Sequence, residues 1–244
     1  MQRKVFRFSG ADVRKFLQNL ITNDVNKLAT GPLYSALLTP QGKFIADFFL
    51  IPDGNDVLMD VDADASATLI TRLNMYKMRA DVTISETDLI VSRGLENAPE
   101  GAFKDPRDAN LGWRYYSDED LNTDTANWDA LRVEHKIPEM GRELDAESYI
   151  LEMGFEALNG VDFRKGCYVG QEVTARMKHK TELRKGLVRL VAEADIPENA
   201  DVLSNGKVIG STHTSSGKRA LAYLRFDRAE GDIRVNDISV TWQK

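Results

Sequence analysis

Hydrophobic positions in the first part of the chain change from helical to strand periodicity. Hydrophobic side chains recur at helical intervals over residues 10–22, and Ser9 and Asp12 ahead of them have the spacing of a capping box. Three strand-like runs follow, at residues 34–39, 43–51 and 56–61. Turn residues separate these runs, so the pattern predicts one helix followed by an antiparallel meander.

The period changes again further along the chain. Residues 64–77 have the pattern of a second helix, and residues 81–85 and 88–92 that of two strands paired with each other. A connection rich in glycine, proline and asparagine then leads to a strand at residues 112–116. Asp124 is expected to cap a helix that continues to about residue 136.

Helical periodicity disappears after Lys185. Short strand-like runs separated by turn residues occupy residues 186–191, 207–214, 218–226 and 238–242. Runs of this length and spacing are typical of a small β-barrel. The chain is therefore predicted to have an α+β fold, with antiparallel sheets and helices followed by a small C-terminal β-barrel.

Composition and charge narrow the classes of function. The 244 residues are 42% hydrophobic and 29% charged, which is typical of a globular protein. No apolar run approaches the roughly 18 residues that a membrane span needs, and the first residues lack the apolar segment of a signal peptide. The net charge of −6 argues against general nucleic-acid binding, although cations gather between Val161 and Leu190. We expect neither a membrane nor a nucleic acid as a direct partner.

The single cysteine, Cys167, cannot form an internal disulfide, which fits a reducing compartment. Scattered along the chain, His135, His179 and His213 do not form a metal-binding pattern with it, so no metal site is expected. Two cations precede Cys167, and Gln171 opens a segment with the pattern of a short helix. Positive charge and a helix start lower a thiol pKa, which would make Cys167 reactive. The alternative is a structural cysteine that fills a small apolar gap.

The run Lys165-Gly166-Cys167-Tyr168-Val169-Gly170-Gln171-Glu172 resembles the signature of the YgfZ family of folate-binding proteins, relatives of the glycine-cleavage aminomethyltransferase (T-protein, GcvT). The resemblance extends over most of the chain. It includes residues 16–25, 38–43, 76–80, 131–134 and 137–141.

This resemblance implies a GcvT-like ring of three subdomains around a central folate cavity. Residues 1–184 would form the folate-binding region, with one subdomain at approximately 1–45 and 120–184 and the other at 46–119. Residues 185–244 would form the barrel.

The resemblance also implies tetrahydrofolate, or a one-carbon derivative of it, as the cofactor. A pterin presents two donors that one carboxylate accepts, and Glu134 matches the glutamate of the pterin-binding Leu-Arg-x-Glu motif. The glutamate tail of a folate is anionic, and Tyr76 and Arg79 are candidates for lining the cavity or holding this tail. A structural alternative for Glu134 is a salt-bridged helix carboxylate.

Within the motif, Lys165 is expected to lower the pKa of Cys167, and the two are the candidate chemical residues. The remaining motif positions are interpreted as scaffold. These are Gly166, Tyr168, Gly170, Gln171, Glu172 and Arg176.

One position departs from the enzymes of this fold. T-proteins carry two adjacent carboxylates in the strand that holds Ala46 and Asp47, and Ala46 replaces the first of them. Because neighbouring strand residues face opposite sides, Asp47 is expected to point away from the place of the missing group. Whether the chain is an enzyme is therefore left open.

The resemblance implies a tetrahydrofolate-binding accessory protein in iron-sulfur cluster assembly or repair, acting on tRNA modification indirectly through iron-sulfur enzymes. Its partners would be iron-sulfur client or assembly proteins, in the cytoplasm of a bacterium or the mitochondrial matrix of a eukaryote. Two alternatives are a folate-dependent aminomethyltransferase or other one-carbon transferase, and a non-catalytic docking module with an inert cysteine.

Overall fold

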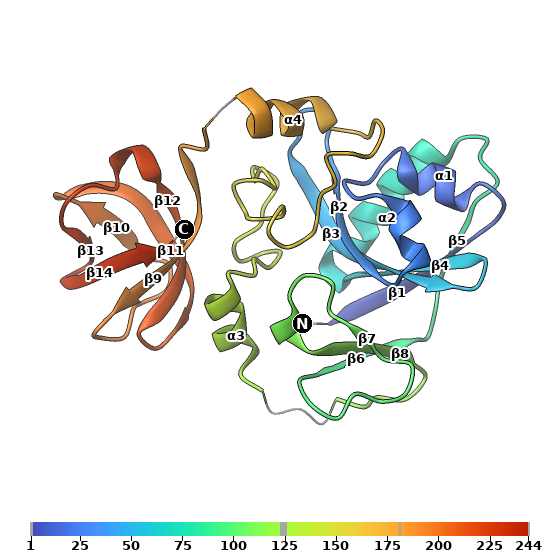
Figure 1. Ribbon diagram of the computed structural model, residues 1–244, viewed down its shortest axis with the longest axis horizontal. Helices are drawn as coiled ribbons and strands as arrows, with labels where there is room; N and C mark the ends of the chain where they lie inside the picture. The colour runs from blue at the N-terminus through green and yellow to red at the C-terminus, as the bar shows by residue number, and fades with distance from the viewer. Residues whose placement is uncertain (1, 123–125, 181, 244) are drawn as a thin grey trace. The chain divides into compact units, whose positions relative to one another are not determined.

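A computed structural model describes residues 2–122, 126–180 and 182–243, with the side chain of Lys180 left aside (Figure 1). By its internal contacts the chain divides into two compact units. The first unit comprises residues 1–126 and 155–175, and the second comprises residues 127–154 and 176–244. The domain limits expected from the sequence stay a prediction, as does the ring of three subdomains.

A five-stranded antiparallel sheet in the order β2-β3-β4-β1-β5 forms the centre of the first unit (Figure 1). Its strands are β1 (Arg3–Ser9), β2 (Leu33–Leu38), β3 (Phe44–Asp53), β4 (Asp56–Asp62) and β5 (Thr83–Glu86). The predicted meander is confirmed as β2-β3-β4, and every residue of β2 is buried. A short second sheet has the order β6-β8-β7, from Ile90–Gly94, Trp113–Ser117 and Phe103–Lys104.

Two helices of the first unit follow the predicted periodicity. They are α1 (Val13–Gln18) and α2 (Ala63–Lys77). Asp62 caps α2 by accepting the N–H of Asp64 at 2.9 Å, and Leu69 and Leu73 of α2 are fully buried. Short 3-10 helices lie at Val25–Ala29 and Ala109–Leu111.

Two local predictions in this unit were wrong, and one strand was missed. The expected capping box does not form, because the Asp12 carboxylate accepts the N–H of Asp81 instead of capping α1. The strands expected to pair with each other, now β5 and β6, lie in different sheets: β5 pairs with β1, and β6 with β8. The sequence patterns also left β1 unassigned. Pairing depends on contacts between distant parts of the chain, which local periodicity does not record.

The second unit contains the predicted C-terminal barrel, closed in the order β10-β11-β12-β9-β14-β13. Its strands are β9 (Lys185–Ala192), β10 (Asp201–Ser204), β11 (Lys207–Ser216), β12 (Arg219–Arg225), β13 (Ile233–Val235) and β14 (Ile238–Gln243), with a 3-10 turn at Phe226–Arg228. Alternate residues such as Val188, Leu190, Ala220 and Ala222 fill the barrel interior. Burial of this alternating set stabilises the barrel by the hydrophobic effect.

Helix α3 (Trp128–His135) also belongs to the second unit. Asn127 caps it by accepting the N–H of Ala130 at 3.0 Å, whereas the expected cap, Asp124, lies outside the described residues. Lys136 ends it in a left-handed conformation, with φ 53°. Helix α4 (Gln171–Lys180) begins within the cysteine motif, where the sequence predicted a helix.

Candidate functional site

The cysteine motif forms a loop of the first unit that ends in α4. Lys165 is buried, and its Nζ donates to the carbonyl oxygens of Gln18 at 2.7 Å, Ile21 at 2.5 Å and Asn23 at 3.1 Å. Burial lowers the pKa of Lys165 to about 8, and the charges of Asp24 and Asp162 offset this only in part. Three carbonyl acceptors match the three N–H groups of an ammonium, so Lys165 ties the motif to the end of α1 as a cation.

The hydrogen bonds of Lys165 determine how it could act on the Cys167 thiol. With its three N–H groups donated to carbonyls, its ammonium acts on a neighbouring thiol through charge rather than through a hydrogen bond. The Lys165 ammonium also lies over the Tyr168 ring, 4.9 Å from its centroid. The effect of Lys165 on Cys167 stays a prediction.

Cys167 itself is exposed at the surface of this loop, and Gly166 and Arg164 beside it are also exposed. The neighbouring Tyr168 is buried, and burial raises its pKa to about 12. Exposed and buried side chains therefore alternate along the loop. The Cys167 thiol is accessible, while the buried Tyr168 anchors the loop. An apolar gap filled by Cys167, the structural alternative, does not match this exposure.

The other side of the motif is held by a close backbone approach. Gly170 has φ +85°, and a Cβ built on it would lie 2.7 Å from the carbonyl oxygen of Thr39. A Cβ built on Gly42, in the turn between β2 and β3, would lie 2.9 Å from Val173. Only glycine fits both positions, so the loop is clamped against this turn. Among the other scaffold candidates, Gln171 and Glu172 begin α4, and Arg176 lies further along it, exposed.

We expect Gly170→Ala to lower the free energy of unfolding by about 1–3 kcal/mol, because the new Cβ meets backbone at a positive φ. Gly166→Ala is the matched control, since a Cβ there meets nothing within 4 Å. Urea unfolding of both variants measures the difference. Equal stability of the two variants would show that the loop adjusts and that the clamp is unimportant.

Glu134 lies near the end of α3, in the second unit. Its Oε1 accepts from Arg189 Nη1 at 2.6 Å, and its Oε2 pairs with Arg219. Both arginines project from neighbouring barrel strands, β9 and β12. Arg189 also donates to the backbone carbonyl of Glu134 at 2.7 Å, so the carboxylate is held in one orientation. Glu134 is thus salt-bridged, as the structural alternative expected, and its side chain keeps 38% exposure.

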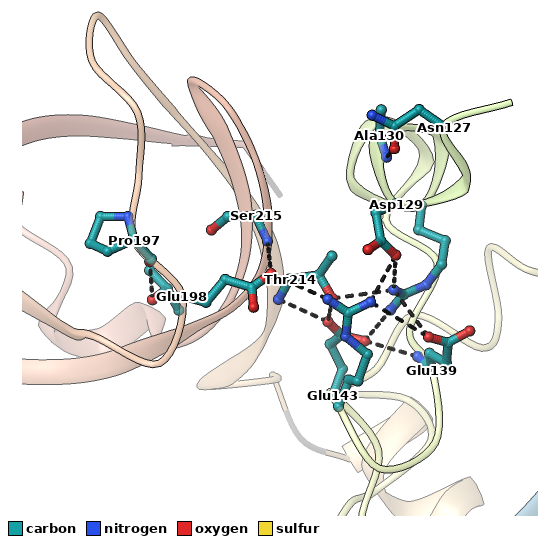
Figure 2. Close-up of polar contacts among 12 residues, drawn as sticks. Asn127, Asp129, Ala130, Glu139, Glu143, Pro197, Glu198, Thr214 and Ser215 are labelled. Carbon is teal, nitrogen blue, oxygen red and sulfur yellow. Dashed lines mark hydrogen bonds and ion pairs between the residues drawn. The ribbon is translucent and has the colours of Figure 1, made fainter. Parts of the chain in front are cut away.

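A buried network next to Glu134 fixes α3 onto the barrel (Figure 2). The fully buried carboxylate of Glu143 pairs with Arg132 of α3 and accepts from the Thr214 hydroxyl of β11. It also accepts the backbone N–H of Glu139 at 3.0 Å and of Thr214 at 3.2 Å. A buried carboxylate that accepts from this many donors is held firmly in one position. The sequence analysis did not identify Glu143, and no local signal distinguishes it from other glutamates.

Tyr76 and Arg79, the other folate candidates, lie at the end of α2 in the first unit. Tyr76 is half-buried and lines a cavity of about 320 Å³ with Phe16 and Leu20 of the first helical region. Arg79 is exposed in the turn that follows α2. Since Glu134 belongs to the second unit, the folate candidates are divided between the two units.

Ala46 and Asp47 are neighbours in β3, and that they face opposite sides of the strand stays a prediction from the alternation. Asp47 is buried and accepts from the Tyr34 hydroxyl at 2.9 Å. Burial raises the pKa of this carboxyl, although the charge of Arg3 opposes the shift. Ala46 is fully buried. The position where T-proteins have their first carboxylate therefore carries no ionisable group.

The sequence analysis missed a buried ionic cluster beside Asp47. Asp60 of β4 accepts from Arg3 Nε at 2.6 Å, from Arg114 Nη2 at 2.6 Å and from the Tyr116 hydroxyl at 3.0 Å. Arg114 lies 4.0 Å above the Phe49 ring. The signal available in the sequence was an aspartate within the apolar run of β4. An aspartate is buried in such a strand only when a cation or hydrogen-bond donor is its partner.

Among the described residues, no three side chains of histidine, cysteine, aspartate or glutamate gather closely enough to hold a metal ion. No helix in the described part of the chain combines the length and apolar composition needed to span a bilayer.

Known proteins resemble this chain in sequence and in fold. Residues 184–244 match the family described as CAF17, C-terminal beta-barrel domain. The iron-sulfur cluster assembly factor IBA57 homolog, mitochondrial, of Neurospora crassa is 32% identical over 226 residues, covering 76% of this chain and 51% of that protein. The mouse iron-sulfur cluster assembly factor IBA57, mitochondrial, is 28% identical and covers 96% of this chain and 78% of that protein. The chain belongs to the IBA57/CAF17 family.

This membership confirms the resemblance to YgfZ-type proteins. The chain spans about half the length of the Neurospora relative and more than three quarters of the mouse relative. The glycine cleavage system aminomethyltransferase T of Bartonella henselae matches 99% of this chain and 83% of its own with a TM-score of 0.77. At 16% identity that match shows the fold alone, and it confirms the predicted α+β, GcvT-like architecture.

Proposed function

We propose that this IBA57/CAF17-family chain is a tetrahydrofolate-binding accessory protein for iron-sulfur cluster assembly or repair, with Cys167 as its working thiol. The observation that carries the proposal is the exposed Cys167 on a loop tied down on both sides, in a chain whose relatives are named iron-sulfur cluster assembly factors. An accessible thiol on a rigid loop suits a step that needs a defined sulfur position. Complementation of a deletion strain by Cys167→Ser tests the proposal.

Folate binding rests on Glu134. A carboxylate has about four acceptor positions, and its two arginine partners supply one ion pair to each oxygen. Positions therefore remain for the two donors of a pterin edge, in an orientation that Arg189 fixes. Tyr76 and Arg79 are proposed for the cavity wall or the glutamate tail, and tetrahydrofolate or a one-carbon derivative is the proposed ligand.

We expect Glu134→Gln to weaken tetrahydrofolate binding by about 1–3 kcal/mol, because an amide presents a donor where the pterin also donates. Isothermal titration calorimetry measures the change. Glu193→Gln is the control, since that glutamate is fully exposed on the same unit. An unchanged dissociation constant, with an unchanged unfolding midpoint, would remove Glu134 from the pocket.

The burial of Ala46 supports an accessory role over aminomethyl transfer, because no carboxylate stands at the position where T-proteins have their first one. An assay of aminomethyl transfer to tetrahydrofolate separates the two functions. Transfer at the rate of a T-protein would favour the one-carbon transferase instead.

The proposed partners are iron-sulfur client or assembly proteins, and an effect on tRNA modification would be indirect, through iron-sulfur enzymes. The proposed location is the mitochondrial matrix if the source is eukaryotic and the cytoplasm if it is bacterial, and the names of the relatives describe those proteins as mitochondrial.

A further inference from the structure

A surface at the end of α2 combines strain, exposed hydrophobic side chains and unpaired positive charge. We call it the Met78 surface, and it consists of Lys15, Phe16, Arg72, Met75, Tyr76, Lys77, Met78 and Arg79. All of these residues belong to the first unit. Met78 is 87% exposed and Met75 is 66% exposed, the highest values among the large hydrophobic side chains described. A soluble fold does not require either side chain to be there.

Met78 adopts a backbone conformation that disfavours its side chain. Its φ is 46° and its ψ −104°, and the N–H of Ala80 donates to the carbonyl of Lys77 at 2.8 Å. These values describe the second residue of a type II′ turn, a position that glycine occupies without strain. A β-carbon there costs conformational energy, and the exposed side chain recovers none of it through packing. Strain without local compensation points to a role for the side chain itself.

The rest of the surface has an amphipathic arrangement. Arg72, Met75 and Tyr76 follow the spacing i, i+3 and i+4, so they lie along one side of α2, and Arg79 lies in the turn that follows the helix. Tyr76 also forms part of the cavity of about 320 Å³ whose floor includes the buried Phe16. The exposed methionines flank Tyr76 in sequence at the end of α2, so adaptable apolar side chains and a small hollow occur on the same segment, which suits apolar side chains of a partner.

Charge identifies the kind of partner. Lys15, Arg72, Lys77 and Arg79 make no ion pair with any residue that the structure describes. The nearby acids are turned toward backbone: Asp12 accepts the N–H of Asp81 at 2.9 Å, and Asp81 accepts that of Ala11 at 3.1 Å. The four cations outnumber these two acids, so the surface carries a net positive charge, in a chain whose net charge is −6.

We propose that the Met78 surface docks an acidic, amphipathic segment of a partner protein, with its apolar side chains on Met75 and Met78 and in the Tyr76 cavity, and its carboxylates on the four cations. This combination of methionine contacts and charge complementarity is typical of recognition of amphipathic segments. A lipid surface fits less well, because the apolar face of α2, with Leu69 and Leu73, is buried within the unit.

The proposal goes beyond the proposed function, since it assigns a protein-binding surface away from Cys167 in sequence. Tyr76 and Arg79 are also the proposed folate contacts, so the tests change Met78 and Arg72, which have no proposed role in folate binding. The first test is Met78→Gly, which relieves the turn and removes the exposed side chain. We expect the thermal midpoint to rise by about 2–4 °C, while complementation of a deletion strain falls at least fivefold. Val208→Ser is the matched control, because Val208 is 52% exposed on the barrel, and it is expected to leave complementation unchanged.

The second test places a photo-crosslinking residue at position 78 in cells, with position 208 as the control site. The expected result is an adduct whose crosslinked peptide, identified by sequencing, has a net negative charge, and whose yield falls at least fivefold with Arg72→Glu. Full complementation by Met78→Gly would overturn the proposal, as would adducts only with lipid, with a second copy of this chain or with none. Failure of the wild-type chain to complement would count against the proposed function alone, because the crosslinking result does not depend on it.

Discussion

Cys167→Ser is expected to reduce the activity of dependent iron-sulfur enzymes to the level of a deletion strain, while folding and folate binding persist. A serine hydroxyl has nearly the same shape as a thiol, but it neither ionises near neutral pH nor acts as a soft metal ligand. Because Cys167 is exposed, the substitution leaves no buried cavity. Enzyme activities in the complemented strain, with the chain at native expression level, measure the effect.

Two controls accompany this prediction. Gly166→Ala changes the residue next to the thiol without a steric conflict, and it is expected to complement fully. Iodoacetamide should alkylate the native chain without denaturant, since the thiol is accessible, and should leave Cys167→Ser unmodified. Full complementation by Cys167→Ser would show that the motif is a scaffold and would leave folate binding as the remaining proposed role.

Asp60→Asn is expected to cause the largest loss of stability, about 3–5 kcal/mol, because it leaves the guanidinium groups of Arg3 and Arg114 without their buried counter-charge. An asparagine also turns an amide donor toward donors that the carboxylate satisfies. Urea unfolding measures the loss. Asp227→Asn, which breaks the exposed pair with Arg225, is the control and is expected to leave the midpoint unchanged.

The pH dependence of stability tests whether Asp60 acts through its ion pairs. Burial alone would raise the pKa of Asp60, but Arg3 and Arg114 outweigh it and hold the pKa below its usual range. The folded state therefore binds fewer protons than the unfolded state, so this contribution is present above about pH 4 and is lost as the pH falls through the folded pKa. The difference in stability between the wild type and Asp60→Asn should narrow below about pH 4. A constant difference down to pH 2 would contradict the ion-pair explanation.

Local periodicity was sufficient for several elements of this protein. The helix at Ala63–Lys77, the meander β2-β3-β4 and the barrel strands β9, β11, β12 and β14 follow from side-chain patterns within each segment, whereas the short barrel strands β10 and β13 were missed. The helix is buried along one face and the barrel strands largely on alternate residues, while the meander strands are buried almost throughout and read as continuous apolar runs. Each of these patterns is visible in neighbouring residues. The family resemblance likewise depended on short contiguous motifs, above all the one around Cys167.

The pairing of strands and the partners of buried charged residues depended on contacts between residues that are far apart in the sequence. The partners of β1 are β4 and β5, which lie far along the chain, and no pattern within Arg3–Ser9 names them. The strand containing Asp60 has an apolar pattern, and only the fold brings Arg3 and Arg114 to its carboxylate. Hydrogen bonds and ion pairs form through space, and spatial neighbours are set by topology rather than by sequence distance.

The cysteine motif shows both kinds of information in a few residues. By itself the sequence determined that one thiol lies between two glycines, after two cations and before a helix. Only the tertiary structure decided that Lys165 turns inward to the carbonyls of Gln18, Ile21 and Asn23, that Gly170 packs against Thr39, and that Cys167 stays exposed. The reason is that a buried ammonium must find several acceptors at once, and only the folded backbone at the end of α1 supplies them together.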